Sequence, residues 1–296
     1  MKLRKITLRG LAALLLCGVF FALPISVAGA ETAEEMHSGW IYDFPPDAAS
    51  VNISLDGERV LEGEAAILND VTYVPLRSFA ELFGTDSITW NARTSTATVK
   101  KGNTVINIGD RLHYIEASGR YFYSSVPTRN ISDRLFVPIR AIAKAFCVDV
   151  GWDNGSRTVT LKATGEELLS ADRYYSADDL YWLSRIINAE SGGESLIGKI
   201  AVGNVVINRK NSRSYPNTIY GVIFDRNGGT QFSPVAMGTI YRTPSAESIM
   251  AAKICLDGYS VDTGILFFMN PRIATNNWIS KNRPFAFRIG NHHFYY

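Results

Sequence analysis

Hydrophobic and polar residues alternate with a period of two in several short segments of the first half of the chain. Because successive side chains of a strand point to opposite faces, this alternation predicts half-buried β-strands. The clearest segments are Val51 to Leu55, Thr104 to Ile108 and Thr158 to Leu161. We therefore expect a mainly β domain over residues 51–163.

The same half contains an internal repeat. Residues 73–80 (YVPLRSFA) return as residues 136–143 (FVPIRAIA), and the Trp-bearing segment around Trp90 returns around Trp152. Proline is well tolerated in the first turn of a helix, where its missing N–H has no intrahelical partner. Each unit is therefore predicted to be a strand, a short helix with the proline in its first turn, and a second strand that carries the tryptophan.

These units are similar to those of the copper amine oxidase N-terminal-like domain, a module of many secreted bacterial proteins. Copper would need several His, Met or Cys ligands, and His113 and Cys147 are the obvious candidates in this segment, so we expect no copper site. Arg77 and Arg140 hold the same position in the two units, and we expect them on helix surfaces or in packing contacts, with a role in binding a ligand as the alternative. The resemblance implies a wall-targeting or partner-binding module, and a wall or protein partner is the expectation for this domain.

From Ser176 onward the apolar residues recur every three or four positions, which is typical of helices. Ser176 and Asp179 have the spacing of a capping box, so a helix is expected to begin at about Ala177. Glycines at 192 and 193 should end it. The apolar stripe of this helix contains Leu180, Leu183 and Ile187, and Glu190 continues the same stripe.

Glu190 should therefore face the core near the C-terminal end of the helix. The negative end of the helix dipole and the loss of solvent both disfavour the ionised carboxylate, so its pKa should be raised. A glycosidase general acid needs this property, because it must still hold its proton near neutral pH. A glutamate at a helix end is, by itself, more often solvated or involved in capping.

A longer set of motifs surrounds Glu190. Residues 187–194 (INAESGGE) are followed by residues 198–209 (GKIAVGNVVINR) and by further blocks at residues 215–219 (YPNTI), 231–235 (QFSPV), 268–271 (FMNP) and 289–295 (IGNHHFY). Together they resemble the SleB-type, spore-cortex-lytic cell wall hydrolases over residues 176–296. The chain departs from that pattern at Ser191, Gly192 and Met237, which leaves the acid itself intact.

The resemblance implies a mostly helical, lysozyme-like (transglycosylase-like) catalytic domain in which Glu190 is the catalytic acid. With the first half, this predicts an α+β chain: a mainly β repeat domain at residues 51–163, a linker at residues 164–175 and a catalytic domain at residues 176–296. The implied activity is cleavage of peptidoglycan glycan strands between N-acetylmuramic acid and N-acetylglucosamine, in cell wall or spore cortex remodelling.

The mechanism depends on whether a second carboxylate is near. Hydrolysis by two carboxylates needs a partner at about 5 Å for retention, or about 6.5 to 9.5 Å for inversion. Glu194 is expected to cap the helix that follows it, and Asp225 and Asp257 to lie in turns; the remaining acids after Glu190 are Glu247 and Asp262. This shortage fits a mechanism with a single acid. It agrees with the activity that the resemblance implies, a lytic transglycosylase that forms 1,6-anhydromuramic ends, and a hydrolytic muramidase is the alternative.

Sugar sites combine aromatic faces with amide and hydroxyl groups. The side chains expected to bind substrate are Asn188, Glu194, Gln231, Ser233, Thr239, Tyr241, Asn270, Trp278 and His292. The neighbouring Phe267 and Phe268 are expected in the core. Adjacent histidines in a strand point to opposite faces and the HExxH pattern is absent, so no metal site is expected at His292 and His293, and no cofactor is expected at all.

The first thirty residues have the features of a signal peptide. They contain a basic start, an apolar segment from Leu11 to Leu23 and a small-residue cleavage site at residues 28–30. We expect cleavage there, a linker at residues 31–50, and export to the cell wall or spore cortex, with no membrane association after signal removal. An uncleaved signal anchor is the alternative.

Composition excludes other classes of function. The formal net charge is +2 and no basic stripe alternates with aromatics, so no nucleic-acid partner is expected. Cys147 and Cys255 lie in different predicted domains, so we expect two small buried thiols and no disulfide framework. Two rivals remain: a non-catalytic wall-binding protein, and an amidase or peptidase that would need zinc or a Cys-His or Ser-His pair.

Overall fold

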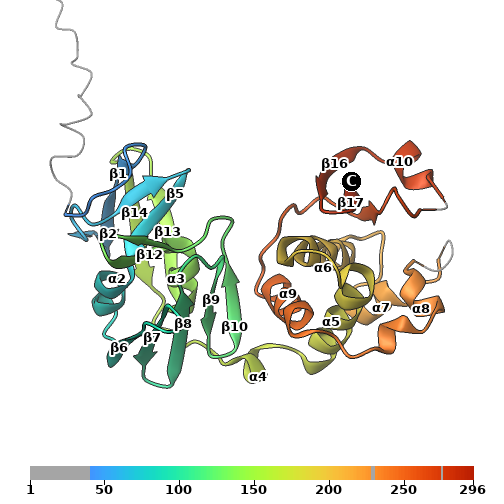
Figure 1. The fold of residues 1–296 in the computed structure, drawn as a ribbon, viewed down its shortest axis with the longest axis horizontal. Helices are drawn as coiled ribbons and strands as arrows, with labels where there is room; N and C mark the ends of the chain where they lie inside the picture. Colours follow the sequence, from blue (N-terminus) through green and yellow to red (C-terminus); the bar gives the residue numbers. More distant parts are fainter. Residues whose placement is uncertain (1–40, 228–230, 275) are drawn as a thin grey trace, which may run out of the picture.

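The computed structural model describes residues 41–227, 231–274 and 276–296. The expected signal peptide and most of the expected 31–50 linker lie outside these residues. The predicted α+β architecture is confirmed, because the described chain forms a mainly β part followed by a mainly helical part (Figure 1). Within the described residues, no helix is both long and apolar enough to cross a membrane.

The mainly β part contains fourteen strands and two short helices. The strands are β1 (Ala49–Ser50), β2 (Asn52–Leu55), β3 (Glu58–Val60), β4 (Ala66–Leu68), β5 (Val71–Pro75), β6 (Ser87–Asn91), β7 (Thr96–Lys101), β8 (Thr104–Gly109), β9 (Tyr114–Ala117), β10 (Arg120–Tyr123), β11 (Arg129–Ile131), β12 (Arg134–Pro138), β13 (Val148–Asp153) and β14 (Thr158–Ala163). The helices are α2 (Leu76–Leu82) and α3 (Ile139–Ala145). The strands form three sheets in the orders β1-β4-β5-β12-β11, β10-β9-β8-β7-β6 and β13-β14-β2-β3.

The internal repeat is confirmed as two strand–helix–strand units, β5-α2-β6 and β12-α3-β13. The equivalent strands β5 and β12 pair with each other in antiparallel register, with Val74 opposite Val137. Each helix begins one residue after its proline, later than expected, because Pro75 and Pro138 are the last residues of their strands and the N-caps of the helices. Both prolines have an extended ψ, 130° at Pro75 and 121° at Pro138, so each still pairs with the neighbouring strand before the chain turns into the helix.

One short helix, α4 (Ala171–Tyr174), lies within the predicted linker at residues 164–175. The mainly helical part follows. Its helices are α5 (Ala177–Ser191), α6 (Leu196–Asn211), α7 (Ile219–Ile223), α8 (Ser233–Ala236), the 3-10 helix η1 (Thr239–Tyr241), α9 (Ala246–Leu256) and α10 (Trp278–Asn282). A small sheet completes it, in the order β15 (Phe267–Met269), β17 (His292–Tyr295) and β16 (Phe285–Ile289).

Helices α5, α6 and α9 pack together as the centre of this part. Gly203 on α6 lies where the other two helices approach most closely. A Cβ atom placed there would come within 2.7 Å of the Cys255 sulfur on α9 and 2.8 Å of the Ile187 Cδ1 on α5. These separations are shorter than van der Waals contact, so a side chain at this position would have to displace the ends of Ile187 and Cys255. With glycine there, α5 and α9 pack closely against the bare backbone of α6.

The mainly β part is fixed to the helical part by a buried ion pair. Arg120 on β10 donates from Nη2 to the Asp257 Oδ1 at 2.6 Å and from Nε at 2.9 Å. The Tyr175 hydroxyl donates to the other oxygen of the same carboxylate. Asp257 does end α9 in a turn, as the sequence suggests, but that expectation missed its role as the contact between the two parts.

A second polar contact lies beside this ion pair. The Lys253 ammonium on α9 donates to the backbone carbonyl of Gly119 at 2.8 Å. The rings of Tyr123 and Tyr259 meet edge to face nearby, with centroids 4.6 Å apart.

Cys147 and Cys255, one in each part, are both free thiols. Cys255 is buried, as expected, whereas Cys147 is only half-buried.

Asp257→Asn should destabilise the folded protein, because it leaves the buried Arg120 guanidinium without a counter-charge. Breaking a buried ion pair from one side destabilises by about 3 kcal/mol, and the free energy of unfolding should fall by about that amount in denaturant titrations. The control is Arg77→Gln, which removes an exposed i,i+4 pair with Glu81 at 3.6 Å and should change the same quantity by less than about 1 kcal/mol. Equal effects of the two substitutions would contradict the anchoring role.

Candidate active site

Glu190 lies in the last turn of α5 and is half-buried. Helix α5 begins and ends where the sequence predicts: the Ser176 hydroxyl accepts a hydrogen bond from the Asp179 N–H at 3.3 Å, and Gly192 follows as the C-cap. Leu183 and Ile187 of the predicted stripe are fully buried. The face of α5 that carries Glu190 is therefore the face that packs against the rest of the domain.

The Glu190 carboxyl has lost most of its solvation. Burial raises its pKa from 4.5 to about 7, and the charge of Arg209 opposes this rise. No other carboxylate among the described residues contributes to this shift. An acid in this state holds its proton near neutral pH and can donate it to a bound group.

Arg209 was missed by the sequence reasoning. It lies on α6, its side chain is buried, and its Nε donates to the Leu266 carbonyl at 2.8 Å. Within the described residues, its Nη1 has no hydrogen-bond partner. Burial lowers the pKa of this guanidinium, and Tyr215, Asp225 and Glu190 oppose the change. The sequence does contain a signal for Arg209. It follows Val202 by seven positions and Val206 by three, so it is a basic residue on an otherwise apolar helix face.

Three aromatic rings surround the Arg209 guanidinium. Its central carbon lies 5.2 Å from the ring centroids of both Tyr215 and Phe232, and 5.4 Å from that of Phe267. Aromatic faces attract a cation through their quadrupole, most strongly where water is excluded. The rings thus hold a charged group in an apolar place beside the acid. Phe267, expected in the core, is half-buried and lies at this position.

The other acids of the domain are engaged elsewhere. Glu194, expected to cap α6, accepts hydrogen bonds instead from the Asn291 amide side chain at 2.9 Å and its backbone N–H at 3.3 Å. The expectation of a cap was wrong, because the β16–β17 turn comes close to Glu194: a Cβ on Gly290 would lie 1.9 Å from its Oε2. Glu247 pairs with the buried Lys199 at 2.6 Å.

The two remaining candidates, Asp225 and Asp262, also have local partners. Asp225 accepts from the Asn227 N–H at 2.9 Å, as expected for a turn. Asp262 accepts from the Gly264 N–H at 2.7 Å and from the Tyr296 hydroxyl at 3.0 Å. Asp257, the fifth acid that follows Glu190 in the sequence, pairs with Arg120. In the described part of the chain, therefore, all five of these acids have a structural partner.

Some of the expected substrate residues are brought to α5 by short elements that pack against it. Ser233 begins α8, and Thr239 and Tyr241 form part of η1; both elements contact α5. Gln231 comes directly before α8 and donates from Nε2 to the Asn227 carbonyl at 2.9 Å.

The remaining expected residues are more dispersed. The Asn188 amide oxygen accepts from the Ser245 N–H at 3.0 Å and so fixes the start of α9. Asn270 accepts from the Arg272 N–H at 3.0 Å in the turn after β15. Trp278 is exposed on α10, with its ring centroid 6.5 Å from that of Phe267.

His292 is the first residue of β17, the central strand of the small sheet, and its side chain is buried. Burial lowers its pKa, which Glu194 opposes from 3.9 Å. Its ring meets that of Phe268 edge to face, with centroids 5.3 Å apart. Across the described residues, no group of three or more His, Cys, Asp or Glu side chains is arranged to hold a metal ion.

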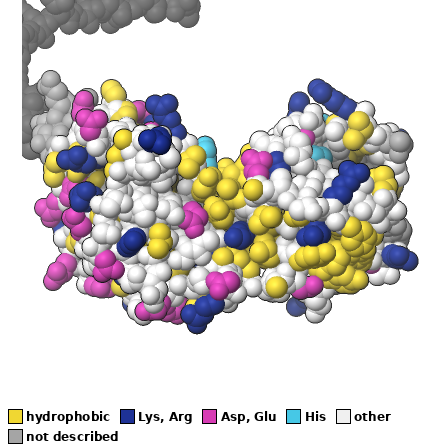
Figure 2. All heavy atoms as spheres, turned by 60° about the horizontal axis from the view of Figure 1, so that its bottom comes forward, with side chains coloured by type: hydrophobic (Ala, Val, Ile, Leu, Met, Phe, Trp, Pro, Cys, Tyr) yellow, Lys and Arg dark blue, Asp and Glu magenta, His cyan; other side chains and the backbone are white. Residues whose placement is uncertain are grey.

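An aromatic surface extends along α5 away from Glu190. Trp182 lies at its centre, with ring centroids 5.3 Å from Tyr220, 5.0 Å from Phe224 and 6.3 Å from Tyr241. Tyr181, Tyr220 and Tyr241 are exposed. Hydrophobic side chains gather over this part of the molecule in Figure 2. Only Tyr241 of this surface was among the expected residues; the adjacent Tyr-Trp pair in the first half of α5 was the signal for the rest.

Comparison with known proteins gives two family matches. The family model described as Cell Wall Hydrolase matches residues 193–295, and Glu190 lies just before this range. The model described as Copper amine oxidase N-terminal domain matches residues 54–161.

Curated relatives match the C-terminal half. A spore cortex-lytic enzyme of Bacillus cereus is 38% identical over 120 residues, which is 40% of this chain and 45% of that protein. A spore cortex-lytic enzyme of Halalkalibacterium halodurans is 35% identical over 133 residues, which is 45% of this chain and 39% of that protein. The chain thus spans less than half the length of these relatives.

Solved structures match the same region. The catalytic domain of the germination-specific lytic transglycosylase SleB from Bacillus anthracis is 37% identical, and the match covers 41% of this chain and 97% of that one, with a TM-score of 0.38. The catalytic domain of the Bacillus cereus SleB protein is also 37% identical, with 41% and 92% coverage and a TM-score of 0.37. The C-terminal part of this chain therefore belongs with the SleB-type cell wall hydrolase domains, and a copper amine oxidase N-terminal-like domain precedes it.

Proposed function

We propose that this protein is a lytic transglycosylase that cleaves peptidoglycan glycan strands, with Glu190 as its general acid. The observation that carries this proposal is the pKa of Glu190, raised to about 7 by burial with no carboxylate contributing to the shift. The names of its relatives support the substrate class. We infer an exported protein that acts on cell wall or spore cortex.

The reaction needs only one acid. Protonated Glu190 donates its proton to the glycosidic oxygen as the bond from that oxygen to the muramoyl C1 breaks. The resulting carboxylate then removes the proton from the C6 hydroxyl of the same muramoyl residue, whose oxygen bonds to C1. The product is a 1,6-anhydromuramoyl end, and Glu190 is protonated again. No water is consumed, so no second carboxylate is required to activate one.

Arg209 can stabilise the Glu190 carboxylate that exists between the two proton transfers. Glu190 becomes an anion after the first proton transfer, in a place where burial disfavours charge. The fixed guanidinium stabilises that anion without approaching it closely enough to form an ion pair, so the acid keeps its raised pKa in the resting protein. The neighbouring rings and the Leu266 carbonyl prevent the guanidinium from moving away.

The aromatic surface around Trp182 supports the choice of a sugar polymer. Trp182 and Glu190 are eight positions apart on α5, which separates their Cα atoms by roughly 12 Å along the helix axis. Sugar rings pack on exposed aromatic faces while their hydroxyls bond to nearby polar groups. We propose that successive sugars lie along this surface, with Tyr241, Thr239 and Ser233 at its side.

Glu190→Gln should abolish the release of fragments from purified peptidoglycan, because an amide is not acidic enough to transfer a proton to the glycosidic oxygen. Loss of a general acid lowers the rate by roughly 10²- to 10⁴-fold or more. The matched control is Asp179→Asn, the same exchange of acid for amide in the first turn of the same helix, which should leave the rate unchanged. Full activity of the Glu190 variant, with its fold confirmed by circular dichroism, would contradict the proposal.

The rate should depend on pH through Glu190. The protonated form is the active one, and its pKa is raised from 4.5 to about 7, so activity should persist well above pH 4.5. It should then fall as pH rises through about 7, by about tenfold per pH unit beyond that point. Initial rates on soluble glycan fragments between pH 5 and 9 measure this. A decline that begins near pH 4.5 would show an ordinary solvated acid.

The product distinguishes the transglycosylase from the hydrolytic muramidase. Mass spectrometry of the digest should show anhydromuramic ends, which are lighter than reducing ends by one water. A digest in H₂¹⁸O should leave these ends unlabelled. Reducing muramic ends that carry ¹⁸O, without anhydromuramic ends, would contradict intramolecular transfer and favour hydrolysis.

A further inference from the structure

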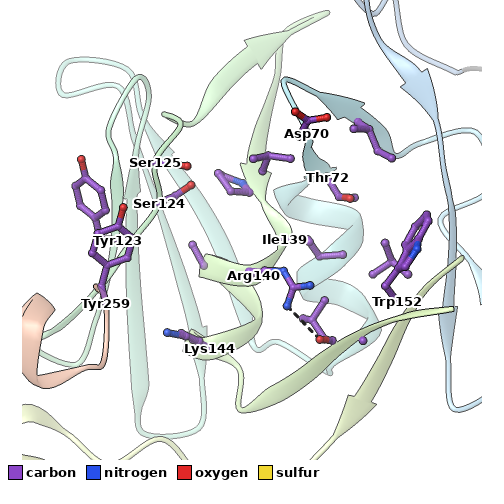
Figure 3. Close-up of a pocket in the computed structure, with 17 residues that line it drawn as sticks. Asp70, Thr72, Tyr123, Ser124, Ser125, Ile139, Arg140, Lys144, Trp152 and Tyr259 are labelled. Atoms are coloured by element: carbon purple, nitrogen blue, oxygen red, sulfur yellow. Dashed lines mark hydrogen bonds between the residues drawn. The ribbon is translucent and has the colours of Figure 1, made fainter. Parts of the chain in front are cut away.

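A pocket of about 650 Å³ lies in the mainly β part, where it meets the helical part. Helix α3 and strand β13 form its floor, and the loop after β10 forms one wall (Figure 3). Tyr259, from the loop after α9, closes that wall from the helical part. Its volume is in the range of sites that bind small molecules or polymer segments, roughly 300 to 1,000 Å³. It is separate from the residues assigned to Glu190 chemistry.

The two repeat units differ in charge at this pocket. In the first unit Arg77 pairs with Glu81, four residues later on α2, at 3.6 Å. In the second unit the same two positions on α3 are Arg140 and Lys144, and both line the pocket. Among the described residues neither of these two cations forms an ion pair. The second unit therefore presents two adjacent positive charges where the first neutralises its own.

The rest of the lining combines rings and hydroxyls. Tyr123 and Tyr259 stand at one end of the pocket and Trp152 at the other, with Arg140 between them (Figure 3). The Trp152 side chain is exposed, although its indole N–H bonds to the Asn154 amide oxygen at 2.7 Å. The hydroxyls of Thr72 and Ser124 also line the space. Exposed rings that flank cations suit a ligand with apolar or sugar faces and negative charges.

The Arg140 side chain is positioned to bind such a ligand. Its Nη1 donates to the Val150 carbonyl of β13 at 3.3 Å, which fixes the guanidinium across the pocket floor. Its other N–H groups form no hydrogen bond with any residue that the structure describes. A planar guanidinium with free donors can take a carboxylate in a two-point contact, and Lys144 adds a second positive charge one helical turn away.

We propose that this pocket is a second peptidoglycan-binding site, which holds a carboxylate-bearing stem peptide and its sugar through Arg140, Lys144 and Trp152. The choice of polymer rests on the proposed function. Tyr259 is attached to the helical part, because the Asn204 amide on α6 donates to its carbonyl at 2.9 Å. The Arg120–Asp257 ion pair holds the two parts in register beside it. A wall segment bound here therefore stays near the domain of Glu190 and raises the local concentration of its substrate.

The test measures binding to insoluble peptidoglycan in the Glu190→Gln background, so that no polymer is digested. Arg140→Gln with Lys144→Gln should weaken sedimentation with purified sacculi by roughly three- to tenfold. The matched control removes two charges outside the pocket, Arg77→Gln with Lys100→Gln, and should leave binding unchanged. Trp152→Ala should also weaken binding to the sacculi. Trp90→Ala, at the equivalent position of the first repeat unit, should leave this binding unchanged. Circular dichroism checks that each variant is folded.

Three results would overturn the proposal: no change with the pocket variants, equal losses with the control variants, or binding that disappears when teichoic acid is stripped from the sacculi. The last would identify a phosphate polymer as the ligand. Turnover of short soluble glycan fragments by the Arg140→Gln, Lys144→Gln enzyme with native Glu190 should equal that of the parent. If the parent itself cleaves no glycan but pocket-dependent binding persists, the proposed activity fails while the binding site stands.

Discussion

The close packing of α5, α6 and α9 at Gly203 is the contact on which the helical part depends. Since any Cβ at this position would overlap Ile187 on α5 and Cys255 on α9, the two outer helices share one bare stretch of α6 backbone. Ile187 is one turn before Glu190, so the same contact sets the depth of the acid. Arg209 lies on α6 beyond Gly203, and its place relative to Glu190 follows from the same helix pair.

Charge placement then follows from burial. Glu190 is half-buried and Arg209 is buried, and their charges influence each other without an ion pair between them. Burial raises the pKa of Glu190 to about 7, although the charge of Arg209 opposes the rise. The other acids are drawn into structural contacts, such as Glu194 with Asn291. In the proposed reaction, Glu190 is therefore the one residue that transfers protons. The buried Arg120–Asp257 pair uses charge differently, since its partners neutralise each other and hold two parts together.

Local patterns in the sequence predicted much of this structure. The limits of α5 followed from Ser176 and Gly192, and the repeat units followed from their proline-containing octapeptides. Contacts between distant segments could not be predicted in this way. The local sequence suggests that Glu194 caps a helix. Its actual partner, Asn291, is 97 positions away, so no local pattern could reveal it. Arg209 and Asp257 were missed as functional or anchoring residues for the same reason, because their surroundings come from several elements that only the fold brings together.

The central claim is that burial keeps the Glu190 carboxyl protonated near neutral pH. Infrared difference spectroscopy between the native chain and Glu190→Gln isolates the carboxyl stretch of this one residue, and its intensity can be followed from pH 4 to 9 without substrate. The account predicts a titration midpoint at a pKa of about 7. A midpoint near 4.5, the value of a solvated glutamate, would contradict it.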